Sequence, residues 1–144
     1  CRSVMAEQIT RQLMLDAGKE IDVMSRGENA LEGEPMSELA EKALDLIGYS
    51  SEFHLASPLA ESDVESADLV LTVTKVLAVE LIARSPESAP KVYSLAEYAK
   101  LFKSDGDFQD IKDPYGSDFE TYVKTAKQIE NCLEAIVDKL AKQP

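Results

Sequence analysis

Apolar residues near the start of the chain recur at the spacing of an α-helix. Three of them lie on one stripe: Met5, Ile9 and Leu13. This stripe predicts a helix from Ser3 to about residue 17, ended by Gly18. The same spacing predicts a second helix from Ser37 to residue 47, ended by Gly48, and a third over residues 76–83.

Capping boxes mark further helix starts. In this motif a serine and a glutamate three residues later each accept a hydrogen bond from the other's backbone N–H. Three pairs are interpreted as such boxes: Ser62 with Glu65, Ser94 with Glu97, and Ser117 with Glu120. The last pair predicts a long amphipathic helix, whose inner face is formed by Phe119, Tyr122, Val123, Ala126, Ile129, Leu133, Ile136, Val137 and Leu140.

Three short segments between these helices have the character of strands. They are residues 21–25 (IDVMS), 69–73 (LVLTV) and 91–95 (KVYSL). The alternation of helices and strands predicts an α/β fold, in which a mostly parallel sheet has helices on both faces. Because the first helix has no preceding strand to cross over from, the pattern also predicts that the chain as given lacks its first strand.

Composition and charge narrow the class of protein. The 144 residues suit one domain, and 15 Lys and Arg against 27 Asp and Glu give a net charge of −12. This charge argues against nucleic acid and anionic membranes as partners, so a phosphate-bearing substrate would need a local positive site. The two cysteines, Cys1 and Cys132, lie at opposite ends of the chain. They predict a reducing, intracellular setting with no disulfide framework and no metal cluster. We also expect a cytoplasmic protein that needs no cofactor and no metal.

The start of the first predicted helix is the candidate for that positive site. Unpaired N–H groups and the positive end of the helix dipole meet at a helix N-terminus, and the Arg2 guanidinium can donate two hydrogen bonds to one phosphate. Ser3 would cap the helix. The simpler alternative is a solvated Arg2 beside an ordinary cap.

Motifs along the whole chain resemble the low-molecular-weight protein tyrosine phosphatases. CRSVMAE is similar to the second half of that family's phosphate-binding loop, C-x-G-N-x-C-R-S-x-M-A-E. SRG, GEPMSELAEKAL, ADLVLTVT and DPYGSDFETY match later family motifs in the same order. The resemblance implies one phosphatase domain over residues 1–144, N-terminally incomplete. It also implies a flavodoxin-like, phosphotyrosine phosphatase I-like fold, with four parallel strands in the order 2-1-3-4.

The resemblance also implies the roles of individual residues. Arg2 would clamp the phosphate of a phosphorylated protein, or another oxyanion, and Asp113 would be the general acid and base. Ser3 and His54 would share a hydrogen-bond network that supports the loop, and Cys1 would be the second cysteine of the loop. Asp113 has an alternative as a turn residue, since D-P-Y-G is good turn chemistry, and the two roles are compatible. His54 has an alternative as an ordinary half-buried histidine.

Two further residues would line the substrate cleft. Tyr115 would stack on an aromatic substrate ring, its alternative being core packing. Ala30 stands where many members carry a bulky residue. An arginine is also missing from the His54–Pro58 stretch, and Val73 replaces the usual methionine. The small residue at position 30 and the missing arginine bear on substrate preference.

The attacking cysteine of the family would lie five residues before Cys1, outside this sequence. Cys1 cannot replace it, because no five-residue loop separates it from Arg2. We therefore expect residues 1–144 alone to be inactive and poorly folded, since losing a central strand exposes two sheet edges and part of the core.

Four hypotheses follow. The first is a phosphotyrosine phosphatase with a phosphocysteine intermediate. A protein-arginine phosphatase of the same fold is the second, and the loop residue that discriminates the two would immediately precede Cys1. A thioredoxin-coupled arsenate reductase would need additional cysteines after the third strand, where none occurs, and Cys132 is expected to be packed. The last is a non-enzymatic, phosphate-binding interaction module.

Overall fold

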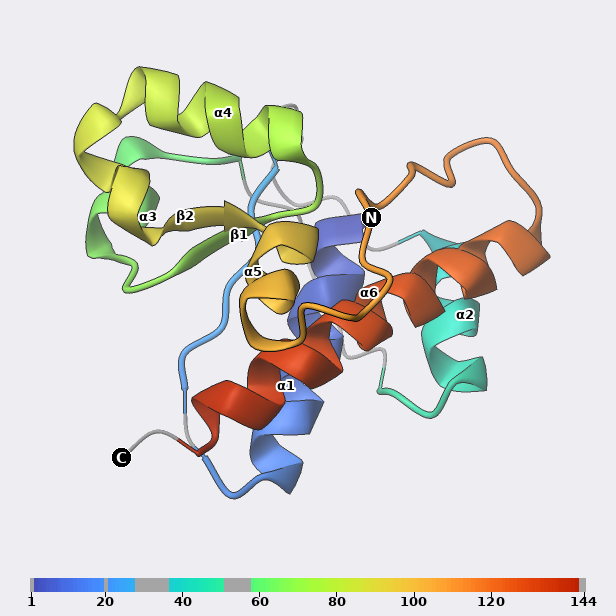
Figure 1. Ribbon diagram of the computed structural model, residues 1–144. Helices are drawn as coiled ribbons and strands as arrows, with labels where there is room; N and C mark the ends of the chain where they lie inside the picture. Colours follow the sequence, from blue (N-terminus) through green and yellow to red (C-terminus); the bar gives the residue numbers. More distant parts are fainter. Residues whose placement is uncertain (1, 20, 28–36, 51–57, 143–144) are drawn as a thin grey trace.

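Helices surround a short parallel sheet in the computed structural model, which describes residues 2–19, 21–27, 37–50 and 58–142 (Figure 1). In chain order the elements are α1 (Arg2–Asp16), α2 (Glu38–Leu46), α3 (Glu61–Ser66), β1 (Val70–Thr72), α4 (Lys75–Arg84), the 3-10 helix η1 (Pro86–Lys91), β2 (Val92–Ser94), α5 (Leu95–Phe102) and α6 (Phe119–Leu140). None of the described helices is long and apolar enough to cross a membrane.

Several predicted helix boundaries are confirmed. The Ser37 hydroxyl accepts the Ala40 N–H and begins α2. Ser94 and Glu97 form the predicted capping box at the start of α5. Gly18 follows α1 with a φ of 74° and Gly48 follows α2 with a φ of 93°, the left-handed conformation in which glycine ends helices.

Two predicted capping boxes are wrong. At α6 the cap is Asp118, whose carboxylate accepts the Thr121 N–H at 3.0 Å. Ser117 cannot serve, because its own N–H is held in a turn by the Pro114 carbonyl at 2.9 Å. At α3 the Asp63 carboxylate reaches back to the Ala60 N–H at 2.9 Å, so the helix begins ahead of the predicted box at Ser62 and Glu65.

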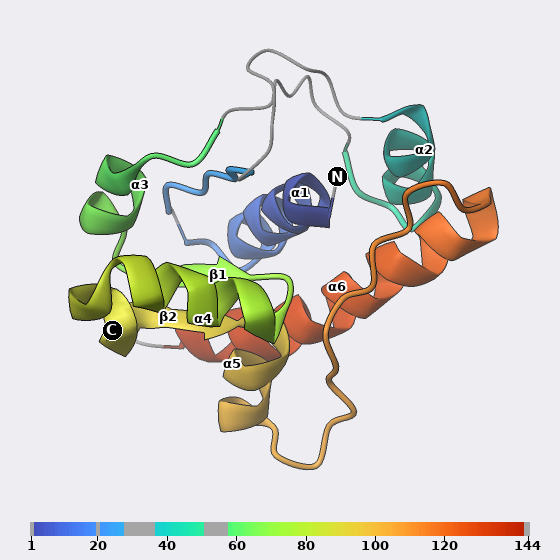
Figure 2. The same ribbon diagram turned by 90° about the horizontal axis from the view of Figure 1, so that it is seen from above.

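The parallel sheet separates two apolar clusters. β1 and β2 pair in the register Val70 with Val92, Leu71 with Tyr93, and Thr72 with Ser94. Because side chains alternate across a strand, Val70 and Val92 pack with α3 and α4 while Leu71 packs against the larger cluster on the other side. Figure 2 shows α4 on one side of the strand pair and α5 and α6 on the other. This arrangement confirms the predicted α/β fold in its class, a parallel sheet with helices on both faces.

The predicted strand over residues 21–25 does not form. Its backbone groups bond instead to side chains of α1: the Val23 carbonyl accepts from Arg11 at 2.7 Å, and the Ser25 N–H donates to Glu7 at 2.8 Å. Within the described ranges, pairing on this side of the molecule is limited to one parallel bridge, Gly27 to Pro58. The described residues therefore contain a two-stranded sheet, whereas three of the four strands of the expected sheet are predicted within this chain.

Helix α6 organises the larger cluster. Its buried face packs against α1, α2 and α5, as the apolar stripe predicts. The Tyr49 hydroxyl, just after α2, donates to the Glu130 carboxylate on α6 at 2.6 Å. Partial burial and this carboxylate raise the pKa of Tyr49, so the hydroxyl stays a donor and joins α2 to α6.

Candidate active site

Arg2 is the first residue of α1, and its half-buried side chain faces a segment far away in the sequence. The Nη1 atom donates to the Ile111 carbonyl oxygen at 2.7 Å. Asp113 follows two residues later, which places its Cα within about 7 Å of Ile111 along an extended chain. Figure 1 shows the N-terminal end of α1 beside the orange segment that leads to α6. The structure thus brings the two predicted catalytic residues into one neighbourhood.

The N-terminus of α1 differs in charge from most other helix starts. The first turns of α2, α3, α5 and α6 carry acidic residues, which occupy the positive end of the helix dipole. The first turn of α1 carries none. In a chain with a net charge of −12, Arg2 and this helix end form a local positive region that suits an anion.

The segment before Asp113 is fixed to the core. Phe108 and Ile111 are 2% and 1% exposed, and the Ile111 N–H donates to the Val73 carbonyl just after β1, at 3.0 Å. Gly106 permits the close packing of Phe108, because a Cβ at position 106 would overlap the ring. The segment therefore runs past the carboxyl end of the parallel strands, where α/β folds place their sites.

Pro114 to Ser117 form a turn, and the side chain of Asp113, the residue before it, bonds to its backbone. The Tyr115 N–H donates to the Asp113 carboxylate at 3.0 Å, and the Ser117 N–H donates to the Pro114 carbonyl. Gly116 has a φ of 80°, as a type II turn requires at its third position. The turn role of D-P-Y-G is confirmed. It leaves the Asp113 carboxylate exposed, where it can reach a substrate.

The remaining predicted residues are placed as follows. Tyr115 is 86% exposed, so the alternative of core packing is wrong. Ser3 is the second residue of α1 rather than its cap. Cys1, Ala30 and His54 lie outside the described residues. Among the described residues, no group of three or more His, Cys, Asp or Glu side chains is arranged to hold a metal ion.

A family model described as low molecular weight phosphotyrosine protein phosphatase matches residues 1–144. The chain belongs to this family. It is 30% identical over 142 residues to the protein-arginine-phosphatase of Bacillus subtilis (strain 168), covering 99% of this chain and 91% of that protein. It is also 30% identical to the low molecular weight protein-tyrosine-phosphatase PtpB of Staphylococcus haemolyticus, covering 90% and 84%.

Solved structures agree with this assignment. The low molecular weight protein tyrosine phosphatase from T. tengcongensis superposes with a TM-score of 0.85 at 34% identity, covering 96% of this chain and 91% of that one. A YwlE arginine phosphatase mutant with a phosphorylated active-site serine gives a TM-score of 0.88 at 30% identity, covering 99% and 90%.

Glu7 is a buried acidic residue of this phosphatase-family chain for which the motifs predict no role. Its carboxylate is 7% exposed and accepts both the N–H and the hydroxyl of Ser25, at 2.8 and 2.9 Å. Arg11 lies 3.6 Å away and neutralises part of its charge. Glu7 therefore holds residues 21–27 against the helix that carries Arg2. The one sequence feature that could have pointed to this role is the position of Glu7 at the end of the CRSVMAE motif.

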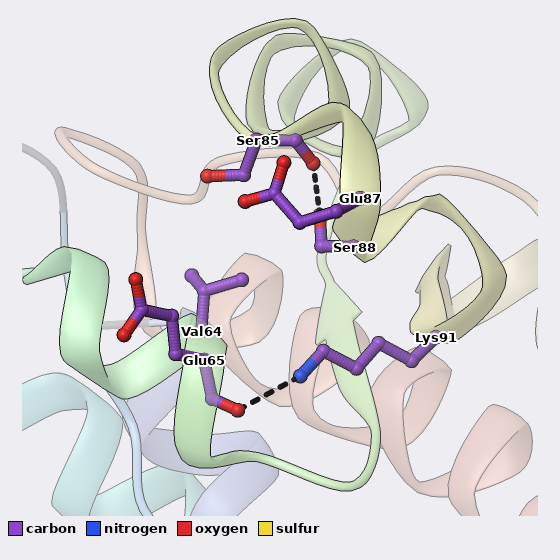
Figure 3. A pocket seen from close by; sticks show the side chains of 6 residues that line it. All are labelled: Val64, Glu65, Ser85, Glu87, Ser88 and Lys91. Atoms are coloured by element: carbon purple, nitrogen blue, oxygen red, sulfur yellow. Dashed lines mark hydrogen bonds between the residues drawn. The ribbon is translucent and has the colours of Figure 1, made fainter.

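A cavity of about 170 Å³ lies elsewhere on this family member, between α3 and the junction of α4 with η1 (Figure 3). The Lys91 ammonium beside it donates to the carbonyls of Glu65 and Ala67, at 3.2 and 2.7 Å, and so closes the C-terminal end of α3. Because Lys91 precedes β2, this cavity lies at the opposite edge of the sheet from Arg2. Its lining includes two glutamates, Glu65 and Glu87, and no arginine.

Cys132 lies on the buried face of α6 and is packed in the core of the protein, as expected. It is 1% exposed, and burial raises the pKa of its thiol to about 11. A buried thiol with a raised pKa is a poor nucleophile. This excludes Cys132 as the attacking group and removes support for the arsenate reductase hypothesis.

Replacing Cys132 by alanine is therefore expected to leave phosphatase activity within about twofold and to lower the free energy of unfolding by about 1 kcal/mol. The measurement is p-nitrophenyl phosphate hydrolysis, with denaturant unfolding of the same samples. This experiment and the others use the full-length protein, that is, residues 1–144 together with any residues that the gene encodes before or after them. A large loss of activity at unchanged stability would contradict the packing role.

Proposed function

We propose that the protein is a protein phosphatase that hydrolyses phosphotyrosine. The observation that carries this proposal is the bond from Arg2, at the N-terminus of α1, to the carbonyl two residues before Asp113. In this proposal Arg2 is the oxyanion clamp, and the proposal is supported because the exposed Asp113 carboxyl group follows two residues after the carbonyl that Arg2 holds. Hydrolysis of a phosphate monoester needs both a clamp for the phosphoryl oxygens and an acid for the leaving oxygen.

The proposed reaction has two steps. A cysteine thiolate attacks phosphorus while the bond to the leaving oxygen breaks, and Asp113 gives its proton to that oxygen. Water then attacks the phosphocysteine, Asp113 takes a proton from the water, and phosphate leaves as the thiolate is restored. Arg2 and the N–H groups of α1 hold the phosphoryl oxygens in both transition states. The acid matters because a phenol has a pKa of about 10, so an unprotonated phenolate is a poor leaving group.

The nucleophile is proposed to be a cysteine five residues before Cys1 in the full-length protein. Cys132 is buried, and Cys1 adjoins Arg2 in the sequence. In this proposal residues 1–144 are one incomplete phosphatase domain. A preceding strand would complete the four-stranded order 2-1-3-4, beside β1. Cys1, Ser3 and His54 would support the phosphate-binding loop, and residues 1–144 alone would be inactive.

The exposure of Tyr115 supports an aromatic substrate. Tyr115 is 86% exposed and its backbone N–H is bonded to the Asp113 carboxylate, so the residue adjoins the proposed acid and its side chain is open to solvent. A phosphotyrosine ring at this position can stack on it. Ala30 is proposed to line the same region.

A second candidate is hydrolysis of phosphoarginine. It is favoured by the protein-arginine-phosphatases of Bacillus subtilis and Geobacillus stearothermophilus, at 30% and 29% identity. The PtpB tyrosine phosphatases match at 30% and 31%, so identity alone does not separate the two substrates.

The deciding experiment compares the full-length protein on a phosphotyrosine peptide and a phosphoarginine peptide of the same sequence. We expect phosphotyrosine to be hydrolysed with the higher kcat/KM. A higher kcat/KM for phosphoarginine would contradict the first candidate and support the second, a protein-arginine phosphatase. Binding of inorganic phosphate or vanadate without turnover of either peptide would overturn both and favour an interaction module.

A further inference from the structure

In the segment of residues 107–114 every third residue is buried, and the residues between them are exposed. Phe108, Ile111 and Pro114 are buried. Asp107, Asp110 and Asp113 are exposed. The segment therefore presents three carboxylates to solvent while every third residue is held in the core. Only the last of the three is the proposed acid.

Asp110 is the point at which this segment is fastened to the rest of the protein. Its carboxylate oxygen Oδ1 accepts the backbone N–H of Lys75, the first residue of α4, at 3.0 Å. Its carbonyl accepts the Gln128 side-chain amide of α6 at 3.2 Å. The next residue, Ile111, is bonded to Val73 through its N–H and to Arg2 through its carbonyl. Four parts of the fold thus converge on two consecutive residues.

The start of α4 shows what the Asp110 side chain contributes. The first turn of α4 contains no acidic residue of its own, unlike the first turn of α5 with Glu97. Asp110 supplies the negative charge from a different part of the chain, where the helix dipole stabilises it. The bond is therefore charge-assisted and directional.

Asp113, in contrast, has no such anchor. Among the described residues its carboxylate accepts a hydrogen bond only from Tyr115, which belongs to the same turn. The position of the acid relative to Arg2 is therefore set by its neighbours in the chain: the fastening at residues 110 and 111 on one side and the buried Pro114 on the other. A displacement of about 1 Å at a reacting group can cost up to about a hundredfold in rate.

We propose that Asp110 is a positioning residue for the general acid Asp113, acting by fastening the segment to the N-terminus of α4 and, through its backbone, to Gln128. This inference rests on the proposed function. It assigns Asp110 no contact with substrate. Its effect is confined to the two steps in which Asp113 acts, first as acid and then as base, and kcat/KM reports the first of them.

The test compares kcat/KM of the full-length protein for phenyl phosphate, a poor leaving group, and p-nitrophenyl phosphate, a good one. For Asp110→Ala we expect a loss of about tenfold on phenyl phosphate and of less than about threefold on p-nitrophenyl phosphate. Asp110→Asn keeps an acceptor for the Lys75 N–H and should recover most of the loss. Inhibition by inorganic phosphate should not change, because the Arg2 clamp is intact.

Asp107→Ala is the matched control. It removes the same charge from the same segment, but the Asp107 carboxylate accepts the side-chain amide of Gln109 at 3.1 Å, a bond that stays within the segment. We expect both substrates to be hydrolysed at the wild-type rate. In an Asp113→Asn background, Asp110→Ala should produce no further change in the ratio of the two substrates, because the acid it positions is absent.

The outcomes separate the two proposals. Equal losses on both substrates for Asp110→Ala, or a loss as large for Asp107→Ala, would overturn the positioning role while leaving the phosphatase function intact. If the wild-type protein hydrolyses neither aryl phosphate, the proposed function itself fails.

Discussion

Replacing Arg2 by lysine is expected to lower kcat/KM for p-nitrophenyl phosphate by about a thousandfold, because lysine keeps the charge but loses the planar fork of donors. The guanidinium can hold the Ile111 carbonyl through Nη1 and still direct other N–H groups at phosphoryl oxygens. A lysine ammonium also has several donors, but it lacks the planar geometry that donates two parallel hydrogen bonds to a phosphoryl group while another N–H holds the carbonyl. Steady-state kinetics and inhibition by vanadate measure the loss, and the inhibition should weaken in parallel.

Arg11→Lys provides the control for this substitution. Arg11 lies on the same helix and also donates to a backbone carbonyl, that of Val23 at 2.7 Å. We expect its replacement to change kcat/KM by less than about twofold. An Arg2→Lys protein within about tenfold of wild type would show that phosphate is held elsewhere, and so would contradict the site described above.

Replacing Asp113 by asparagine is expected to lower kcat/KM for phenyl phosphate by about a hundredfold or more, and for p-nitrophenyl phosphate by about tenfold. Asparagine can still accept the Tyr115 N–H, so the turn is retained while the transferable proton is lost. The poorer leaving group suffers more because it depends more on protonation. The ratio of the two losses is the informative quantity.

Asp118→Asn is the corresponding control. Asp118 lies in the same connection and caps α6, where hydrogen bonds from Thr121 lower its pKa. Asparagine is an equally good cap, so we expect unchanged kinetics on both substrates. Equal losses on both substrates for Asp113→Asn would argue that Asp113 only shapes the turn.

Local sequence signals were sufficient for most helices. The end of α1 at Gly18 and the capping box at Ser94 and Glu97 each depend on residues within one or two turns. The buried face of α6 follows from periodicity alone. These features are predictable because the interactions that create them join residues close together in the chain.

Features that depend on distant partners were predicted poorly. Residues 21–25 have a strand-like pattern, yet their backbone bonds to Glu7 and Arg11 of α1. The contact of Asp110 with Lys75 spans 35 residues, and no local pattern marks it. Periodicity likewise did not predict that Arg2 and Asp113 lie near each other; only the resemblance of the motifs did. The two residues are brought together by the hydrogen bond from Arg2 to Ile111, which are 109 positions apart in the chain.

The bond between Arg2 and Ile111 also has a thermodynamic consequence for ligand binding. A free arginine side chain loses up to about 2 kcal/mol of rotamer entropy when it is immobilised. In this protein the half-buried guanidinium is already held at the Ile111 carbonyl before any anion arrives. Much of that entropy is therefore lost during folding, and an incoming phosphate meets a preorganised clamp.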